Sequence, residues 1–441
     1  MLFYTLNYLL VFLPTTLFLF FFGKFLKIDI KIVLIVLSIF FYSWWNIYYL
    51  PIILFSIIIN YFFYKKLILI KSNKKKILVF AIVLNILLLI IFKYTDFIIE
   101  NINFIFSTNL NYLNLPFPLA ISFFTFQSIA FLVNVYDEEI LNVKVKDFFL
   151  FIIFFPQLIA GPIVRYNNMM PQFNNEKNYF FNKRNFIIGL IILLIGLIKK
   201  VYFAGTLSEF VDLGHENLSD LNFYSSWLLS LCFTFQFYFD FSGYVDMATG
   251  SALMLNIVLP QNFNSPFKAI SIIDFWQRWH ITLTQFLNNF IYNPLLKSIK
   301  NITFLNSMVV TFIVFIIAGI WHGPSWNFVL FGGFHGLGLI INHTYRKFLN
   351  FKVSKYIFWF LTFNFVNISF IFFRTNEINN IIFILKKMFN FNFSIINYFQ
   401  NDKLLVNFTN DLNLIACFLL SIIVCIFLKN SYRLLEYKVS R

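Results

Sequence analysis

The chain has 441 residues, of which 60% are hydrophobic and 12% carry a charged side chain. Soluble domains average about half apolar and about a quarter charged residues, so this composition excludes a soluble globular protein and predicts one that lies in a bilayer. The net charge of +15 does not indicate a nucleic-acid partner, because no soluble domain remains to carry the binding surface, and we assign these charges to membrane orientation.

Apolar runs that suit helices within a membrane recur along the whole chain. They cover residues 2–22, 31–45, 47–64, 77–93, 119–135, 147–160, 186–204, 225–241, 305–320, 326–341, 356–373 and 411–428. Several runs are too short to cross a bilayer alone, and we expect about 11 transmembrane helices. Pro156, Gly161-Pro162 and Gly332-Gly333 interrupt the runs, and broken backbone at membrane depth is tolerated only inside protein or beside a water-filled cavity. The sequence therefore predicts a single all-α membrane domain over residues 1–441, with a central cavity.

Basic residues predict the orientation of the chain. The run from Leu2 to Phe22 has no preceding positive charge and no cleavage pattern, so we expect a retained spanning helix rather than a signal peptide. The loop from Tyr64 to Lys76 carries six lysines and no acid, which places it in the cytoplasm by the positive-inside rule. Counting helices back from this loop places the N-terminus on the extracytoplasmic side.

Two carboxylates, Asp240 and Asp246, stand in an aromatic segment of the predicted membrane region. An unpaired charge there is costly, so both need partners. Candidate partners are Arg278, Arg165 and the Lys199-Lys200 pair, among which the sequence does not choose. The carboxylates either join two helices as buried ion pairs or face a substrate.

A helix is predicted to begin after Ser271, because this serine is followed by an acid, Asp274, at the third helical position. On that helix Asp274 and Arg278 are four residues apart and can pair, while Trp276 and His280 share another face. Taken alone, this aromatic segment is typical of an interfacial helix with tryptophan anchors.

His322 lies between an apolar run that ends at Ile320 and another that begins at Asn327. Ionisable side chains among spanning helices are expensive and are functional candidates for that reason. Histidine also exchanges a proton near neutral pH, which suits acid–base work on an alcohol. We expect His335, which stands among glycines, to be a packing residue with one hydrogen bond. No metal-ligand spacing is present, so no metal site is predicted.

Several linked motifs resemble those of membrane-bound O-acyltransferases, most closely the bacterial alginate and peptidoglycan O-acetylation branch. They are residues 154–163 (FFPQLIAGPI), 239–244 (FDFSGY), 260–263 (PQNF), 275–283 (FWQRWHITL) and 321–323 (WHG), and the resemblance runs from about 117 to 343. It implies a ring of tilted helices around a central tunnel with a cytoplasmic and an extracytoplasmic funnel.

The resemblance also implies roles for individual residues. His322 corresponds to the catalytic histidine near the constriction of the tunnel, and His280 corresponds to the second motif histidine, which has a supporting role. Gln277 departs from the basic residue that relatives often carry, which leaves Arg278 as the one fixed cation of this motif, and we expect Arg278 to contact the phosphates of the donor. The other positions expected to contact substrate or donor are Trp276, Trp321, Asp240, Ser242, Tyr244 and Asp246.

By this resemblance the chain is expected to move an acetyl group from a cytoplasmic thioester, acetyl-CoA or another, through the membrane to a hydroxyl group. The acceptor is an extracytoplasmic polysaccharide or a partner acetyltransferase of the SGNH type. Peptidoglycan is favoured over alginate because the skewed composition fits an AT-rich bacterium, in which peptidoglycan is universal. The implied location is the inner membrane, with the lipid bilayer and the donor as partners and with no bound cofactor.

Other functions remain open at this point. Alginate or another exopolysaccharide is an alternative acceptor, and long-chain acyl transfer to a lysolipid is an alternative reaction. A proton-coupled transporter or flippase would use the histidines with Asp240 and Asp246 as a proton relay, although the missing repeat symmetry argues against it.

Overall fold

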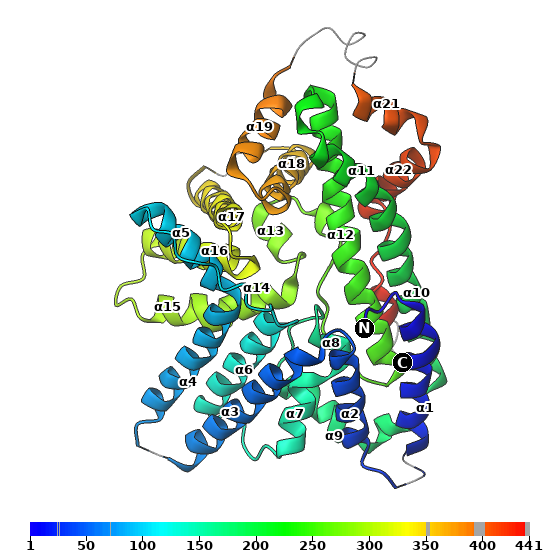
Figure 1. Cartoon of the computed structure of the whole chain (residues 1–441), viewed down its shortest axis with the longest axis vertical. Helices are drawn as coiled ribbons and strands as arrows, with labels where there is room; N and C mark the ends of the chain where they lie inside the picture. The colour runs from blue at the N-terminus through cyan, green and yellow to red at the C-terminus, as the bar shows by residue number, and fades with distance from the viewer. Residues whose placement is uncertain (24, 26, 71, 350–352, 392–401, 437–441) are drawn as a thin grey trace. The chain divides into compact units, whose positions relative to one another are not determined.

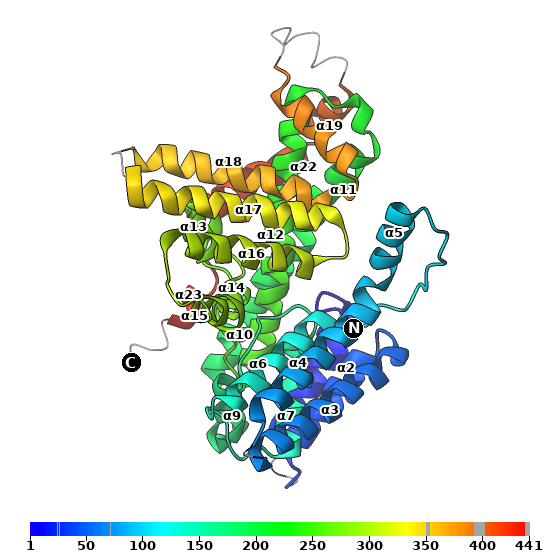
Figure 2. The ribbon, with the colours of Figure 1, turned by 90° about the vertical axis from the view of Figure 1, so that its left-hand side faces the viewer.

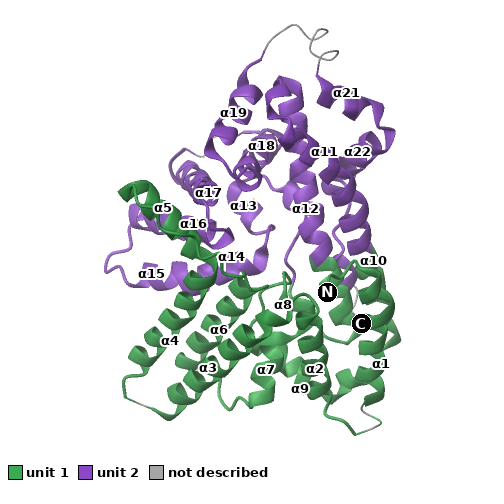
Figure 3. Cartoon of the chain, in the orientation of Figure 1, with its two compact units in different colours: residues 1–194, 245–260 green, residues 195–244, 261–441 purple. Residues whose placement is uncertain are grey.

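The computed structural model describes residues 1–23, 25, 27–70, 72–349, 353–391 and 402–436, and within these residues the chain is helical and contains no strand (Figure 1). The chain divides into two compact units, one of residues 1–194 and 245–260 and one of residues 195–244 and 261–441 (Figure 3). Lys71, one of the six lysines behind the orientation prediction, lies outside the described residues. The single-domain prediction remains a prediction.

The first unit is built from the N-terminal helices. Its elements are η1 (Asn7–Phe12), α1 (Leu13–Gly23), α2 (Ile30–Ser43), η2 (Ile47–Tyr49), α3 (Leu50–Leu69), α4 (Lys74–Leu89), η3 (Ile90–Tyr94), α5 (Thr95–Phe106), α6 (Ile121–Tyr136), α7 (Val145–Ile153), α8 (Phe155–Leu158), α9 (Tyr166–Asn174), η4 (Glu176–Tyr179) and most of α10 (Lys183–Ile198). Helices α3, α4 and α6 run side by side in this unit (Figure 1).

Aromatic side chains fill the core of the first unit. The rings of Phe131 and Phe148 have centroids 4.5 Å apart, and such pairs contribute about 0.5–1.5 kcal/mol beyond the area they bury. The buried Tyr8 hydroxyl donates to the Ser251 hydroxyl at 2.7 Å, so this polar group is satisfied within the core. These contacts order the unit around an apolar interior.

The second unit contains the remaining elements. They are η5 (Lys199–Ala204), α11 (Gly205–Glu216), η6 (Leu218–Asp220), most of α12 (Phe223–Met254), η7 (Pro266–Lys268), α13 (Ile272–Trp276), α14 (Ile281–Leu287), η8 (Asn288–Tyr292), α15 (Asn293–Lys297), α16 (Phe304–His322), α17 (Trp326–Thr344), η9 (Tyr345–Leu349), α18 (Lys355–Arg374), α19 (Ile378–Phe389), α21 (Lys403–Asn410), α22 (Leu412–Ile426) and α23 (Arg433–Glu436). Figure 2 shows α16, α17 and α18 lying alongside one another.

Helices α16 and α17 form a hairpin whose axes approach closely at two glycines. A Cβ atom on Gly319 would lie 2.2 Å from the Phe328 carbonyl oxygen, and one on Gly332 would lie 2.2 Å from the Phe315 carbonyl oxygen. Small residues at such positions allow helix backbones to pack directly on each other. The predicted interruption at Gly332-Gly333 is therefore wrong: α17 is continuous, and Gly332 serves packing instead.

The predicted apolar runs coincide with helices, and the break near Pro156 and Gly161-Pro162 is present, because α7 ends at Ile153 and no helix covers residues 159–165. Five helices of the described chain are long and apolar enough to cross a membrane, or six if the bent pair α21 and α22 counts as one span. The chain is thus a multi-pass membrane protein. The exact number of about 11 spans is not confirmed, and the ring and tunnel remain predictions.

Candidate active site

The segment that carries His280 folds differently from the predicted helix. The helix begins as expected, because the Ser271 hydroxyl accepts a hydrogen bond from the Asp274 N–H at 3.1 Å. It ends at Trp276, however, and His280 adopts a left-handed backbone conformation, with φ 44°, as the N-cap of α14. The prediction that Trp276 and His280 share one helical face is therefore wrong.

Backbone pairing with an upstream segment ends this helix. The Asn264 N–H donates to the Arg278 carbonyl oxygen at 2.9 Å, and the Ile281 N–H donates to the Asn262 carbonyl oxygen at 3.0 Å. These bonds use backbone groups that a continued helix would need for its own i to i−4 ladder. The segment of residues 262–264 therefore holds His280 in a bend between α13 and α14.

The side chain of Asn262 determines which ring nitrogen of His280 carries the proton. Its Oδ1 accepts the Thr282 N–H at 3.2 Å and the Thr282 hydroxyl at 2.9 Å, so this atom is an acceptor. His280 Nδ1, which lies 3.1 Å from the same oxygen, must then be the donor. In the neutral imidazole, Nε2 keeps its lone pair.

His280 is 1% exposed and lies outside the candidate spanning helices, and burial lowers the pKa of its imidazole to about 3. Removal from water disfavours the charged ring, so His280 is neutral at physiological pH. Its ring lies in edge contact with the half-buried Phe241, with ring centroids 4.9 Å apart. The structure therefore presents a neutral imidazole with Nε2 as a proton acceptor.

His322 is the last residue of α16, at the turn of the α16–α17 hairpin, and it is half-buried. Its ring lies in edge contact with Trp321 and Phe373, at centroid distances of 5.1 and 5.2 Å. Trp321 in turn lies 6.2 Å from the His280 ring. Trp321 thus lies next to both histidines singled out from the sequence, and the fold brings the three side chains into one aromatic cluster.

Trp276 and His335 link three helices beside this cluster. The Trp276 indole N–H donates to His335 Nδ1 at 3.2 Å, and His335 Nε2 lies 2.9 Å from the Ser369 hydroxyl on α18. His335 is fully buried and makes two hydrogen bonds where one was expected. It also packs on Phe331, at 4.6 Å, whose ring contacts His322. Sequence reasoning missed this connection because the residues lie on separate elements.

The carboxylate of Asp240 pairs with Lys200, one of the candidate partners predicted from the sequence. This ion pair links η5 with α12, and the Asp240 side chain is 47% exposed in the structure. Asp274 pairs with Arg278, as the four-residue spacing predicted, at 2.7 Å. Asp246 lies in the first unit and is half-buried.

Ser242 and Tyr244, the two remaining candidates on α12, are both buried. The Ser242 hydroxyl has no hydrogen-bond partner among the described residues, and neither has Asn262 Nδ2. Buried polar atoms of this kind are normally satisfied by water or by a ligand. Since Asn262 contacts His280 directly, the site retains unused hydrogen-bonding capacity next to a candidate catalytic group.

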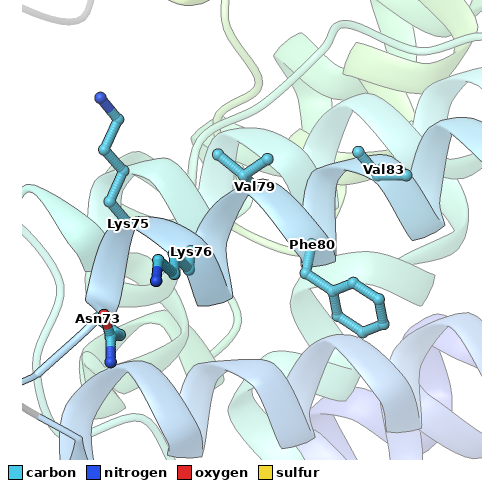
Figure 4. Close-up of a pocket in the computed structure, with 6 residues that line it drawn as sticks. All are labelled: Asn73, Lys75, Lys76, Val79, Phe80 and Val83. Carbon is cyan, nitrogen blue, oxygen red and sulfur yellow. The ribbon is translucent and has the colours of Figure 1, made fainter.

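A cavity of about 550 Å³ in the first unit is formed by the start of α4 (Figure 4). Its described lining residues are Asn73, Lys75, Lys76, Val79, Phe80 and Val83. None of these is a candidate site residue, so we do not assign catalysis to this cavity. Within the described ranges, no three His, Cys, Asp or Glu side chains are grouped so as to hold a metal ion.

Comparison with known proteins identifies the family to which these elements belong. The family model of the membrane-bound O-acyltransferases matches residues 117–382. A peptidoglycan O-acetyltransferase of Helicobacter pylori is 39% identical over 342 residues, which are 71% of this chain and 64% of that protein. A protein named "Probable alginate O-acetylase AlgI" from Azotobacter vinelandii is 31% identical, over 68% of this chain and 60% of its own length.

More distant relatives are named teichoic acid D-alanyltransferases. A teichoic acid D-alanyltransferase of Streptococcus thermophilus is 25% identical, over 58% of this chain and 68% of its own length. The chain spans slightly less than two thirds of the Helicobacter pylori relative. The family model nevertheless includes both His280 and His322 and covers more than half of the residues, so the chain belongs to the membrane-bound O-acyltransferase family.

Proposed function

We propose that this protein is a membrane O-acetyltransferase that delivers acetyl groups to hydroxyls of a cell-envelope polysaccharide, with peptidoglycan as the favoured polymer. The 39% identical relative that is named a peptidoglycan O-acetyltransferase supports this acceptor. The donor in this proposal is acetyl-CoA or another cytoplasmic acetyl thioester, which is a co-substrate rather than a bound cofactor.

The observation that carries the proposal is the cluster of His280, Trp321 and His322. Two imidazoles lie next to one indole, one deeply buried and one half-buried, at the turn of a tightly packed hairpin. Acid–base catalysis of transfer to an alcohol needs a neutral imidazole within reach of the hydroxyl proton. A protein that only packs helices has no need of two histidines in one aromatic cluster.

In the proposed reaction His322 is the general base. It removes the proton of the acceptor hydroxyl as the oxygen attacks the thioester carbonyl carbon, which forms a C–O bond. The C–S bond then breaks, the acetyl group leaves on the acceptor, and His322 returns the proton to the departing sulfur. General acid–base assistance of this kind typically contributes about 100-fold or more.

His280 has a supporting role in this proposal. Because Nδ1 is bound to Asn262, only Nε2 is available, and it accepts rather than donates a proton in the neutral ring. We assign it to a hydrogen bond from the acceptor hydroxyl or from a water molecule that orients His322. A hydrogen bond donated by Nε2 of His280 to the donor carbonyl would require the other tautomer.

Arg278 was expected to meet the donor phosphates. Its Nε donates to Asp274 at 2.7 Å, and its Nη1 donates to the Asn264 carbonyl oxygen at 3.3 Å. These bonds favour a positioning role, in which Arg278 holds the bend that carries His280. Trp276, Trp321, Asp240, Ser242, Tyr244 and Asp246 are retained as proposed contacts of substrate or donor.

We place the protein in the inner membrane of a bacterium, with the N-terminus outside and the lysine-rich loop of residues 64–76 in the cytoplasm. The positive-inside rule supports this orientation. The proposal includes a partner of the SGNH type, an extracytoplasmic acetyltransferase that receives the acetyl group before the polysaccharide does.

The test is complementation of a deletion strain with wild type, His322→Ala and a matched control, His343→Ala. His343 is a half-buried histidine at the C-terminal end of α17 with no proposed role. Alkali-labile acetate is measured on purified wall fragments and on exopolymer, with membrane protein levels determined by immunoblot. We expect acetate on wall fragments with wild type and His343→Ala, and its loss with His322→Ala.

Unchanged acetate with His322→Ala at normal protein level would remove His322 from the mechanism. Acetate that changes on exopolymer instead of wall fragments would favour alginate-type acetylation, a second candidate supported by the 31% identical relative. Long-chain acyl transfer to a lysolipid predicts no change in either polymer and a loss of acylated lipid. A proton-coupled transporter predicts that no acyl donor is consumed.

A further inference from the structure

A second cavity, of about 470 Å³, lies in the second unit, away from the histidine cluster. It is formed by the end of α10 and the start of η5, by α12, by the residue before η7 and by the chain that follows α22. Its described polar lining residues are Lys199, Tyr238, Ser265, Lys429, Asn430, Ser431 and Arg433. The catalytic candidates His280 and His322 are not among the described lining residues, so this cavity is distinct from the site above.

The charge of this cavity is positive. Lys199, Lys429 and Arg433 contribute cationic groups, and no described lining residue is acidic. Lys199 is buried, and its ammonium lies 5.9 Å from the centroid of the Tyr238 ring. Opposite charges attract more strongly where burial keeps water away from them. The cavity therefore favours a negatively charged occupant.

Neighbouring residues increase this positive potential. Lys268 follows Ser265 by three residues, and its ammonium donates to the Leu428 carbonyl oxygen at 2.7 Å. It lies outside the candidate spanning helices, and burial lowers its pKa, with the charges of Arg433 and Arg278 lowering it further. The repulsion among these cations is relieved when an anion binds between them.

The chain after α22 is held in place by side-chain bonds. Asn430 donates to the Asn264 side-chain oxygen at 2.7 Å, and its own side-chain oxygen accepts the Arg433 N–H at 3.2 Å. This turn presents Lys429, Ser431 and Arg433 from one short, anchored segment. Preorganised cationic donors of this kind match the several acceptor oxygens of a phosphate group.

The rest of the wall is apolar, from Ile195, Val424, Leu428 and Leu434. The cavity thus pairs a cationic, donor-rich side with a hydrophobic side. Lys429 follows the last residue of α22 by three positions, and α22 is part of a candidate span. Basic groups at such helix ends lie where lipid headgroups and soluble phosphates both reach them, and basic pockets between membrane helices bind phosphate headgroups.

We propose that this cavity binds the phosphate group of an organic phosphate ester, with Lys199, Lys429 and Arg433 as its cationic contacts. The ester is either an anionic phospholipid or a soluble phosphate-bearing thiol such as coenzyme A. The proposal concerns binding, and it stands whether or not the chain transfers acetyl groups.

The experiment measures binding to the full-length protein purified in detergent. The probes are dihexanoyl phosphatidylglycerol, coenzyme A and inorganic phosphate, with pantetheine as the phosphate-free comparison. The variants are Arg433→Ala and Ser431→Asp, the second of which adds a carboxylate to the cavity, and the matched control is Lys386→Ala, an exposed lysine on α19. Thermal unfolding of each variant checks that it is folded.

We expect Arg433→Ala to weaken the binding of at least one phosphate ester about tenfold, since a hydrogen bond to a charged group is lost. Ser431→Asp should weaken it further, higher salt should weaken it in the wild type, and Lys386→Ala should leave it unchanged. Inorganic phosphate should compete with the ester that binds. If inorganic phosphate competes only with phosphatidylglycerol, the cavity is a lipid site. If it competes only with coenzyme A, the cavity binds a soluble ligand.

The proposal is overturned if none of the three phosphate probes binds the wild type. It is also overturned if pantetheine binds as well as coenzyme A and the lipid does not bind, or if both cavity variants bind every probe as the wild type does. If Ser431→Asp fails to fold, the comparison is made with Arg433→Ala, at an exposed position, and with the charge-preserving variant Arg433→Lys. The affinity of Arg433→Lys for the phosphate ester is expected to lie between those of the wild type and Arg433→Ala.

Discussion

The closest backbone contact in the site region predicts a sharp difference between two adjacent glycines. A Cβ on Gly332 would lie 2.2 Å from the Phe315 carbonyl oxygen, whereas one on Gly333 would lie 3.4 Å from the flexible end of Ile316. Real Cβ atoms approach no closer than 3.0 Å, so Gly332→Ala must move α17 away from α16 by at least about 0.8 Å, and Gly333→Ala requires no movement. His322 is at the turn of this hairpin and moves with it.

The expected magnitudes follow from the two opposing effects of alanine. Alanine stabilises a helix by about 1 kcal/mol relative to glycine, so Gly333→Ala should be neutral or stabilising. Gly332→Ala adds an overpacking cost of about 1–3 kcal/mol, and a displacement of about 1 Å at a reacting group costs about 100-fold in rate. We therefore expect Gly332→Ala to lower acetate on the acceptor polymer at least tenfold while Gly333→Ala stays within about twofold.

The assay compares alkali-labile acetate in complemented deletion strains with thermal unfolding of the purified variants, at matched protein levels. Equal stability and equal acetate for the two alanine variants would refute the reasoning, because the hairpin would then tolerate the separation. Loss of acetate in Gly332→Ala with wild-type stability would show that placement of His322, rather than folding, is what the contact controls.

Three further outcomes are expected. Asn262→Leu should lower acetate transfer about tenfold at normal protein level, because His280 Nδ1 loses its acceptor. The neighbouring change Gln261→Ala should leave acetate transfer unchanged, and equal effects of the two variants would contradict the positioning role of Asn262. Lys200→Gln should lower the free energy of unfolding by more than about 1 kcal/mol, because Lys200 lies in the candidate span of residues 183–216 and its loss leaves the Asp240 carboxylate unpaired away from bulk water; a smaller loss would show that water reaches the pair. The pKa of His280 is lowered to about 3, below its usual 6.5, so unfolding takes up a proton between these pH values. The free energy of unfolding should therefore fall as pH falls through that window, by up to ~1.4 kcal/mol per pH unit. His280→Asn should flatten this part of a profile of melting temperature against pH, and an unchanged slope would contradict the burial argument.

Local sequence pattern and composition were sufficient to predict much of the fold of this protein. The excess of apolar residues predicted a multi-pass helical membrane protein, and most of each apolar run proved to be helical, because a bilayer requires every backbone polar group to be paired within its own segment. The capping serine at Ser271 and the pair of Asp274 and Arg278 were also predicted, since both depend on residues within one turn of each other.

The errors occurred where distant segments compete for the same groups. The helix that was predicted to carry His280 ends at Trp276 because the backbone of residues 262–264, which lies outside this helix, bonds to Arg278 and Ile281. The break predicted at Gly332 is absent because that glycine faces a partner helix. A glycine that breaks a helix and one that packs it are identical in sequence.

The sequence by itself determined that the protein lies in a bilayer, that its fold is helical, and which two histidines are of interest. Only the tertiary structure decided that His280 is a neutral ring with Nε2 as its available nitrogen, that Lys200 is the partner of Asp240, and that cations from η5 and the chain after α22 line one cavity. The physical reason is that helix formation and membrane insertion depend on short-range periodicity and total hydrophobicity. The protonation of an imidazole and the charge of a cavity depend on which side chains from remote segments exclude water around them.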